Sequence, residues 1–212
     1  MSASADIAAR RRLPEIDRYR ALREAAEAVF LRDGYADAHM DEVARVAGMS
    51  KRTLYQHYPS KGALFEAVMQ DSLRPIGIDP AWEHEPDLGA ALRGMLLTLT
   101  RHLFEPRQVA IFRLVIAGVN RAPELADAFH RAGPGRGADS IERRLAAEIA
   151  KGRLWLSDAR NGARMLFGIA IGAAHMALLL GLPGPPPEAE MERLVRDAVE
   201  VFLRGALRPP EG

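Results

Sequence analysis

The chain has 212 residues, of which 48% are hydrophobic and 27% are charged, so it can bury a substantial core and is not a disordered polypeptide. It contains no cysteine, which excludes a disulfide scaffold, a cysteine-ligated metal site and a cysteine nucleophile. The formal net charge of +1 gives no overall sign of a nucleic-acid partner, and the first residues lack the apolar run of a secretory signal. These features predict a globular, cytoplasmic protein.

Apolar residues recur at helical spacing almost throughout the chain, and the alternation typical of β-strands is absent. The predicted fold class is therefore all-α. Residues 1–13 are predicted to form a flexible basic arm, in which Arg10 to Arg12 either contact DNA or belong to a free tail. Helices are then predicted in the first third of the chain over residues 15–32, 39–47, 51–57 and 61–73.

A stretch with three prolines, residues 75–87, separates these helices from a longer set of apolar helical stripes. Gly133 to Gly137 interrupts the later stripes. The predicted helices beyond the proline-rich stretch begin near Leu88, Val109, Pro123, Ile141, Asp158 and Glu188. The long helix that begins near Asp158 is expected to continue to Leu180, and the last helix to Arg204.

Residues 39–58, HMDEVARVAGMSKRTLYQHY, have the spacing of a helix-turn-helix. Gly48 supplies the residue that tolerates positive φ at the turn, and Ser50 is a natural N-cap for the second helix. Leu54 and Tyr58, four residues apart, are the inner anchors of that helix. Its outer face offers the hydrogen-bond donors Lys51, Arg52, Thr53, Gln56 and His57, which suit a helix that enters the major groove of DNA.

The local charge agrees with this motif. No acidic residue lies between Glu42 and Glu66. The cations within this interval are Arg45, Lys51, Arg52 and Lys61. A cluster of one sign on a nearly neutral chain indicates a local anionic partner, although a basic helical face is more often simply solvated.

The segment GMSKRTLYQHYPSKGALFEAV, with AEAVFLRDGYADAHMDEVARVA before it, resembles the DNA-binding signature of the TetR family of bacterial transcription regulators from Arg18 to Met69. The resemblance implies a helix-turn-helix domain over 14–60 and a connecting helix over 61–75. It implies that Lys51, Arg52 and Thr53 reach bases or adjacent phosphates. Phosphate contacts are implied for Tyr55, His57 and Lys61.

The sequence departs from the family pattern before the first helix of the motif, where a threonine usually caps the helix and often touches phosphate. Here His39 and Met40 occupy this position, and we include both among the expected DNA-contacting residues. Glu42, three residues after His39, is expected to supply half of a capping box.

Residues Ile111 to Leu180 resemble, more loosely, the AefR-like C-terminal class of the same family. This resemblance implies an effector-binding and dimerisation domain over 76–212. Antiparallel helices with large apolar side chains leave a cavity closed by a few polar groups. The candidate ligand-lining residues are Met95, Leu99, His102, Phe112, Ile116, Asn120, Phe129, Met165 and Phe167, although each of them alone is more often a core residue.

Residues 165–182 contain a single ionisable side chain, that of His175, and reach the lower length limit of a membrane span. Gly168 and Gly172 also allow two helices to approach closely, and an amphipathic helix follows. We therefore favour a dimerisation helix over a membrane anchor. The residues predicted in this interface are Gly168, Gly172, His175, Leu179, Leu194, Ala198, Val201 and Phe202.

The leading hypothesis is a homodimeric repressor that a small apolar ligand releases from a pseudo-palindromic double-stranded DNA operator, without a metal or cofactor. A two-fold dimer would present its recognition helices about 34–36 Å apart. The alternatives are an all-helical enzyme or a ligand-binding protein that does not read DNA. The only loose catalytic candidates are His102, Asn120, His130 and His175.

Overall fold

The computed structural model describes residues 14–73, 76–132, 139–182 and 184–207. Within these ranges the regular elements are helices, apart from an isolated antiparallel bridge between Leu154 and Leu207, so the predicted all-α class is confirmed. The predicted basic arm with Arg10 to Arg12 lies outside the described residues. The chain divides into two compact units, Met1–Arg74 with Ala110–Pro134 and Pro75–Val109 with Gly135–Gly212.

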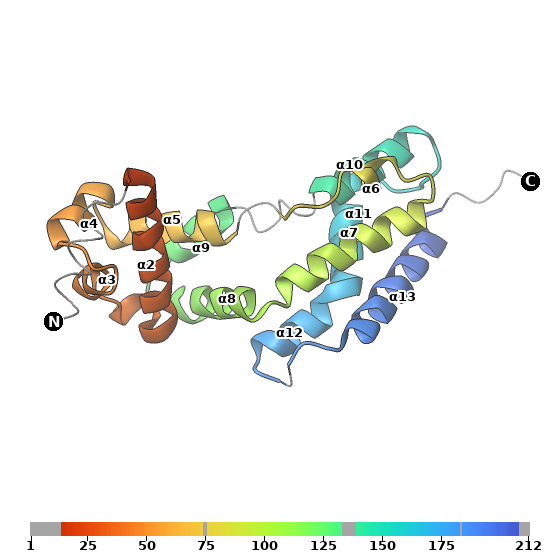
Figure 1. Cartoon of the computed structure of the whole chain (residues 1–212). Coiled ribbons are helices and arrows are strands. Elements are labelled where there is room, and N and C mark those ends of the chain that lie inside the picture. Colours follow the sequence, from red (N-terminus) through yellow and green to blue (C-terminus); the bar gives the residue numbers. More distant parts are fainter. Residues whose placement is uncertain (1–13, 74–75, 133–138, 183, 208–212) are drawn as a thin grey trace, which may run out of the picture. The chain divides into compact units, whose positions relative to one another are not determined.

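The N-terminal unit is built around a single apolar cluster to which all of its helices contribute. Leu22, Phe30, Leu54 and Phe65 are among its fully buried side chains. Figure 1 shows the three helices of the helix-turn-helix region, α2, α3 and α4, beside the connecting helix α5. The helices of this unit are α2 (Glu15–Asp37), α3 (Met40–Val46), α4 (Lys51–His57), α5 (Lys61–Ser72), α9 (Glu124–Ala132) and the greater part of α8 (Pro106–Gly118).

Gly48 and Ser50 act as predicted, whereas α2 continues beyond the predicted end at residue 32. Gly34 has a φ of 77° and interrupts α2, after which the chain makes one more turn to Asp37. Gly48 has a φ of 65° in the turn between α3 and α4. The hydroxyls of Ser50 and Ser60 each accept a hydrogen bond of 3.1 Å, from the backbone N–H of Thr53 and Ala63, and so cap α4 and α5.

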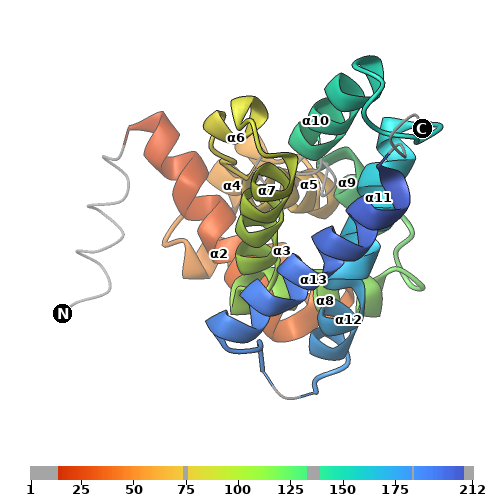
Figure 2. The same cartoon turned by 90° about the vertical axis from the view of Figure 1, so that its right-hand side faces the viewer.

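In the C-terminal unit, α7 and α13 lie side by side (Figures 1 and 2). The predicted long helix from Asp158 to Leu180 forms as one run, with a π-helical segment in its middle. The predicted linker contains an additional short helix, α6. The helices are α6 (Ala81–His84), α7 (Leu88–Leu103), α10 (Asp139–Ala150), α11 (Ala159–Phe167), the π segment η2 (Gly168–Gly172), α12 (Ala173–Leu179) and α13 (Glu188–Ala206).

The division into units differs from the predicted domains. The sequence predicts one domain over 76–212, whereas residues 110–132 pack with the helix-turn-helix region. Ile111 and Leu125 are fully buried in the same apolar cluster as Phe65. Helical periodicity reveals that a helix has an apolar face but not which neighbour covers that face, which is why the sequence could not make this assignment.

Candidate nucleic-acid interface

Helix α4 is held against the N-terminal unit by one fully buried side chain, that of Leu54. Lys51, Arg52 and Gln56 are exposed, and Tyr55 keeps 48% of its surface accessible. Because apolar anchoring is confined to the inner face, the opposite face is available to a partner. It presents cationic and polar groups from the first turn onward, as the motif predicts.

Two of the predicted base-contacting residues have intramolecular partners. The Thr53 hydroxyl shares a hydrogen bond of 2.9 Å with the Ser50 hydroxyl, and Thr53 is partly buried. The Lys51 ammonium forms an ion pair with Asp41 of α3, in which both side chains are more than half exposed. An exposed pair of this kind contributes little to stability, so Lys51 can leave Asp41 for another anion at small cost.

The end of α4 packs against α2 through aromatic side chains. The Tyr19 ring lies 4.4 Å from the imidazole of His57 and 5.9 Å from the ring of Tyr58, measured between centroids. Tyr58 is buried, and its hydroxyl accepts a hydrogen bond of 3.4 Å from Arg23. His57 is partly buried, so it fixes the angle of α4 as well as bordering its exposed face.

The two residues at the start of α3 differ from each other. Met40 is buried in the apolar cluster with Val43 and Ala44, so we correct its assignment from a DNA contact to a packing residue. The reason is that the first turn of α3 points this side chain inward. His39 is exposed in an extended conformation at the N-cap, and its side chain makes no capping hydrogen bond.

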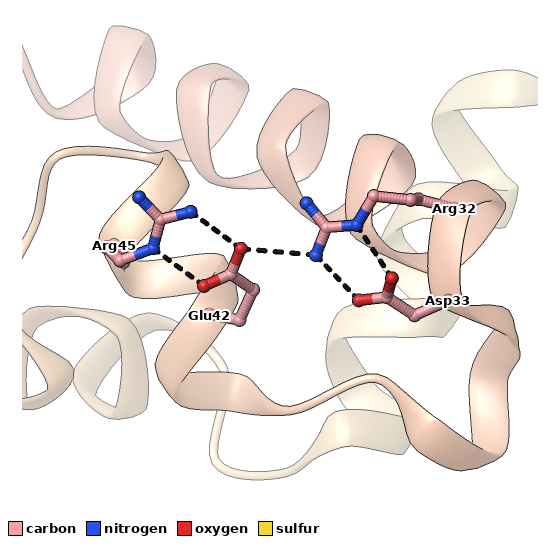
Figure 3. Close-up of polar contacts among 4 residues, drawn as sticks. All are labelled: Arg32, Asp33, Glu42 and Arg45. Atoms are coloured by element: carbon pink, nitrogen blue, oxygen red, sulfur yellow. Dashed lines mark hydrogen bonds and ion pairs between the residues drawn. The ribbon is translucent and has the colours of Figure 1, made fainter.

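The predicted half capping box at Glu42 is replaced by a charge network (Figure 3). The Glu42 carboxylate accepts two hydrogen bonds of 2.7 Å from Arg45 and one of 3.1 Å from Arg32. Arg32 also donates two bonds of 2.7 Å to Asp33. Hydrogen bonds from Arg45 and then Arg32 outweigh desolvation and lower the pKa of Glu42 to about 2. The network fastens α3 to the end of α2.

Lys61, at the start of α5, has partners within the N-terminal unit, and its phosphate contact stays a prediction. Its ammonium donates hydrogen bonds to the backbone carbonyls of Tyr35, Ala36 and Ala38, and lies 4.7 Å from the centroid of the Tyr35 ring. The sequence offered no sign of these acceptors, because they are backbone atoms more than 20 positions away.

Two family profiles match this chain. One, described as bacterial regulatory proteins of the tetR family, covers residues 22–68. The other, described as the C-terminal domain of AefR-like transcriptional repressors, covers residues 90–205, which is more than half of the chain. The chain belongs to the TetR family of transcriptional regulators.

Individual relatives agree with this membership. The chain is 51% identical to the transcriptional activator FasR of Mycolicibacterium smegmatis over 59 residues, which are 28% of this chain and 27% of FasR. It is 26% identical over 191 residues to the DNA-binding transcriptional repressor TetR of Mycobacteroides abscessus, which covers 89% of this chain and 95% of that protein.

Solved structures show the same fold. A TetR-family regulator from Mesorhizobium loti has a TM-score of 0.81 at 24% identity, covering 92% of this chain and 100% of the other. The flavonoid-responsive regulator FrrA has a TM-score of 0.75 at 26% identity, covering 92% and 99%. This TetR-family protein is a DNA-binding transcriptional regulator.

The predicted ligand-lining residues of this regulator are divided between the two units. Met95 and Leu99 are fully buried in the C-terminal unit, and their role in lining a ligand cavity stays a prediction. His102, Met165 and Phe167 belong to the same unit. The candidates in the N-terminal unit are Phe112, Ile116, Asn120 and Phe129.

The accessibility of these candidates varies widely. Phe112 and Phe129 pack edge to face with centroids 5.0 Å apart, and Ile116 is 56% exposed. None of the candidates lines either of two surface pockets, each of which lies within one unit. One pocket is bordered by Tyr35 and Arg113, and the other by Trp82, Arg93 and Arg101, among others.

The predicted dimer-interface residues separate into buried and accessible groups. Ala198 and Phe202 are buried within the C-terminal unit, so we reassign them to the core of the protomer. Leu194 and Val201 are exposed on α13. Gly168 is exposed, whereas Gly172, His175 and Leu179 are partly buried. Burial lowers the pKa of His175, and its ring stacks on that of Phe104.

Further exposed apolar side chains extend the same helical run, and the sequence analysis did not assign them to an interface. Beside Met165, they are Ile169, Met176 and Leu180, and helical spacing relates them to one another. Residues 159–179 are long and apolar enough to cross a membrane, with 33% of the most apolar window buried. Partial burial on one side and apolar exposure on the other are typical of a helix that packs against a partner.

Proposed function

We propose that this regulator is a homodimeric repressor that binds a pseudo-palindromic operator and is released by a small apolar ligand. The exposed cationic face of α4, opposite the buried Leu54, is the observation that carries the DNA-binding part of this proposal. Of the two relatives described above, the repressor aligns over 191 residues, whereas the match to the activator FasR covers only 59 residues. We therefore favour repression.

The roles proposed for α4 follow from the chemistry of its exposed side chains. Arg52 can bind a guanine edge with two parallel hydrogen bonds, and Thr53 can offer its hydroxyl and methyl groups to a neighbouring base. Lys51 and Tyr55 suit contacts to phosphate oxygens, which fix the register of the helix without reading sequence. These side chains project from a helix short enough to lie within one major groove.

The proposed dimer buries the exposed apolar residues of η2 and α12 together with those of α13. Gly168 and Gly172 support this arrangement, because an added Cβ at either position would meet no atom within 4 Å. A partner helix can therefore approach the backbone closely there. A two-fold axis through such an interface would place two copies of α4 about one DNA turn apart, which is the basis of the expected inverted repeat.

The proposed effector is a small apolar molecule bound by the C-terminal part of the chain. The name of FrrA, a flavonoid-responsive regulator, supports an aromatic or otherwise apolar effector class for its relatives. Release of DNA requires that the effector bind one arrangement of the dimer more tightly than the other.

The test begins with selection of bound sequences from a random pool of double-stranded DNA. We expect recovery of an inverted repeat whose half-sites are about one helical turn apart. Fluorescence anisotropy on that operator should then show that Arg52→Ala weakens binding at least tenfold, whereas the control Arg193→Ala, at an exposed position of α13, leaves it unchanged.

Three results would contradict the proposal in different parts. Failure to enrich any sequence, or equal operator affinity of Arg52→Ala and Arg193→Ala, would refute the proposed recognition by α4. Recovery of a single half-site, bound by a monomer, would refute the proposed dimer. If no compound in a panel of flavonoids and fatty acids lowers operator affinity, the proposed release by an apolar ligand is wrong.

A further inference from the structure

We infer that a surface pocket of the C-terminal unit binds a small aromatic anion. The pocket has a volume of about 470 Å³ and lies among α6, α7 and α13. We call it the Trp82 pocket, after the aromatic side chain that borders it. Its volume falls within the range of small-molecule sites in proteins. The inference goes beyond the proposed function and does not depend on it, because the binding concerns one unit of the protein and needs no DNA.

The indole of Trp82 is held in place by contacts of α6 with two other helices. Glu83, the next residue of α6, accepts hydrogen bonds of 3.2 and 2.5 Å from Arg143 of α10. The indole lies directly over Gly94 of α7, where an added Cβ would be 2.5 Å from Cζ2 and 2.7 Å from Cδ2. Glycine therefore lets the ring approach the helix backbone. Trp82 is partly buried, so its ring offers a fixed aromatic surface on which the ring of a ligand can pack.

Cationic side chains surround this aromatic surface. The pocket is bordered by Arg93 and Arg101 of α7 and by Arg196 of α13. Among the described residues that line it, Glu192 is the one acidic residue. A planar guanidinium can donate two parallel hydrogen bonds to a carboxylate. An excess of guanidinium groups beside an indole therefore favours a ligand that combines an aromatic ring with a carboxylate.

The present partners of these arginines are weak competitors for such a ligand. Arg101 donates a hydrogen bond of 2.8 Å to Glu188, and Arg93 lies 3.9 Å from Asp87. The side chains of Arg93, Arg101 and Arg196 are about half exposed, and exposed ion pairs contribute little to stability. Each guanidinium has five N–H donors, so it can keep its present partner and still bind a second anion.

The pocket stays accessible in the proposed dimer. Leu194 and Val201, the exposed apolar residues of α13 proposed for the dimer interface, are two helical turns apart and share one side of the helix. Arg196 follows Leu194 by two positions, which turns it about 200° around the helix axis. The side of α13 that borders the pocket therefore faces away from the proposed partner subunit.

The experiment uses Trp82 as the reporter of binding. The chain contains two tryptophans, and Trp155 is 76% exposed, so Trp155→Phe leaves Trp82 as the single emitter with little effect on the fold. Full-length Trp155→Phe is titrated without DNA with para-nitrobenzoate, an aromatic carboxylate that quenches indole emission. A second titration uses the uncharged para-nitrobenzamide, which has nearly the same shape. The comparison separates recognition of the charge from packing of the ring.

We expect saturable quenching of Trp82 by para-nitrobenzoate. The affinity for para-nitrobenzamide should be lower by about tenfold or more, because hydrogen bonds to a charged group are lost. In the same background, the double variant Arg93→Gln, Arg196→Gln should weaken para-nitrobenzoate binding by about tenfold or more. The matched control is Arg193→Gln, which should leave the affinity unchanged, since Arg193 is exposed on α13 and does not border the pocket.

Three results would overturn the inference. Quenching that does not saturate would mean that the pocket binds no aromatic anion of this size. Equal affinity for the two compounds would mean that the arginines do not recognise the charge, and this comparison remains decisive if the arginine variants do not fold. Equal affinity of the double variant and Arg193→Gln would place the binding elsewhere in the protein. Failure of the operator selection leaves each of these results valid, since none of the titrations contains DNA.

Discussion

Glu148 provides the most stringent test of the energetics of the C-terminal unit. Its side chain is fully buried, and that of its partner Arg144 is 5% exposed. One carboxylate oxygen accepts hydrogen bonds of 2.8 Å from Arg144 and 3.2 Å from Lys151, and the other forms an ion pair with Arg153. Arg144 also donates a 2.7 Å bond to the carbonyl oxygen of Glu85, which ties α10 to the segment after α6.

Substitution Glu148→Gln keeps the shape of the side chain and removes its charge. Lys151 and Arg153 are about half exposed and can turn toward water, whereas Arg144 stays buried without its counter-ion. Breaking a buried ion pair from one side costs about 3–5 kcal/mol. For a chain of this length, that cost corresponds to a fall in melting temperature of roughly 6–20 °C.

The assay is thermal unfolding followed by circular dichroism and calorimetry, with Glu200→Gln as the control. Glu200 forms an exposed ion pair with Arg204 at the same four-residue separation on a helix. We expect this control to shift the melting temperature by no more than about 2–4 °C, because exposed pairs contribute about 0–1 kcal/mol. If Glu148→Gln lowers the melting temperature no more than Glu200→Gln does, the reasoning that burial makes an ion pair costly to break is refuted.

The pH dependence of the same site has a definite sign. Burial raises the pKa of Glu148, but hydrogen bonds from Arg153 and Lys151 and the charge of Arg144 outweigh it, so the pKa is lowered in the folded protein. A carboxyl group with a lowered folded pKa stabilises the fold above its ordinary pKa and loses that contribution as the pH falls further. We therefore expect acid to reduce the difference between wild type and Glu148→Gln.

Three further predictions concern other contacts. Gly94→Ala should lower the melting temperature by the equivalent of about 1–3 kcal/mol, because the added Cβ would lie 2.5 Å from Cζ2 of Trp82, whereas Gly205→Ala meets no atom and should not. Glu42→Gln should lose its destabilising effect as the pH falls from about 4.5 toward 2, measured by urea unfolding, because the folded pKa of Glu42 is about 2. Ser50→Ala should cost about 1 kcal/mol in the same assay through loss of the cap of α4, and equal stability would contradict the capping role.

The elements of the helix-turn-helix could be predicted because their signals are local. Gly48 adopts a positive φ, and Ser50 and Ser60 cap the helices that follow them. Each of these interactions spans no more than a few residues, so the sequence contains both partners within one window. The exposed face of α4 follows from the same periodicity, since Leu54 alone is buried.

Features that depend on distant partners could not be predicted in the same way. Lys61 binds carbonyls that any residue type would supply, so no pattern of side chains marks its site. Helix α8 begins in one unit and continues into the other, although its apolar stripe resembles those of its neighbours. Arg101 pairs with Glu188, 87 positions away. Such contacts are set by how helices pack rather than by propensity.

Not all of the positively charged residues that first indicate DNA binding are free to contact DNA, because several of them have partners within the protein. Arg45 is neutralised by Glu42, and Lys61 is occupied by backbone carbonyls. Lys51 has Asp41 as a partner, so among the described cations between Glu42 and Glu66 only Arg52 forms no ion pair or side-chain hydrogen bond. Because an unpaired guanidinium gives up no intramolecular contact on docking, Arg52 is the side chain of α4 for which a base contact costs least, and sequence recognition should depend on it more than on the total charge.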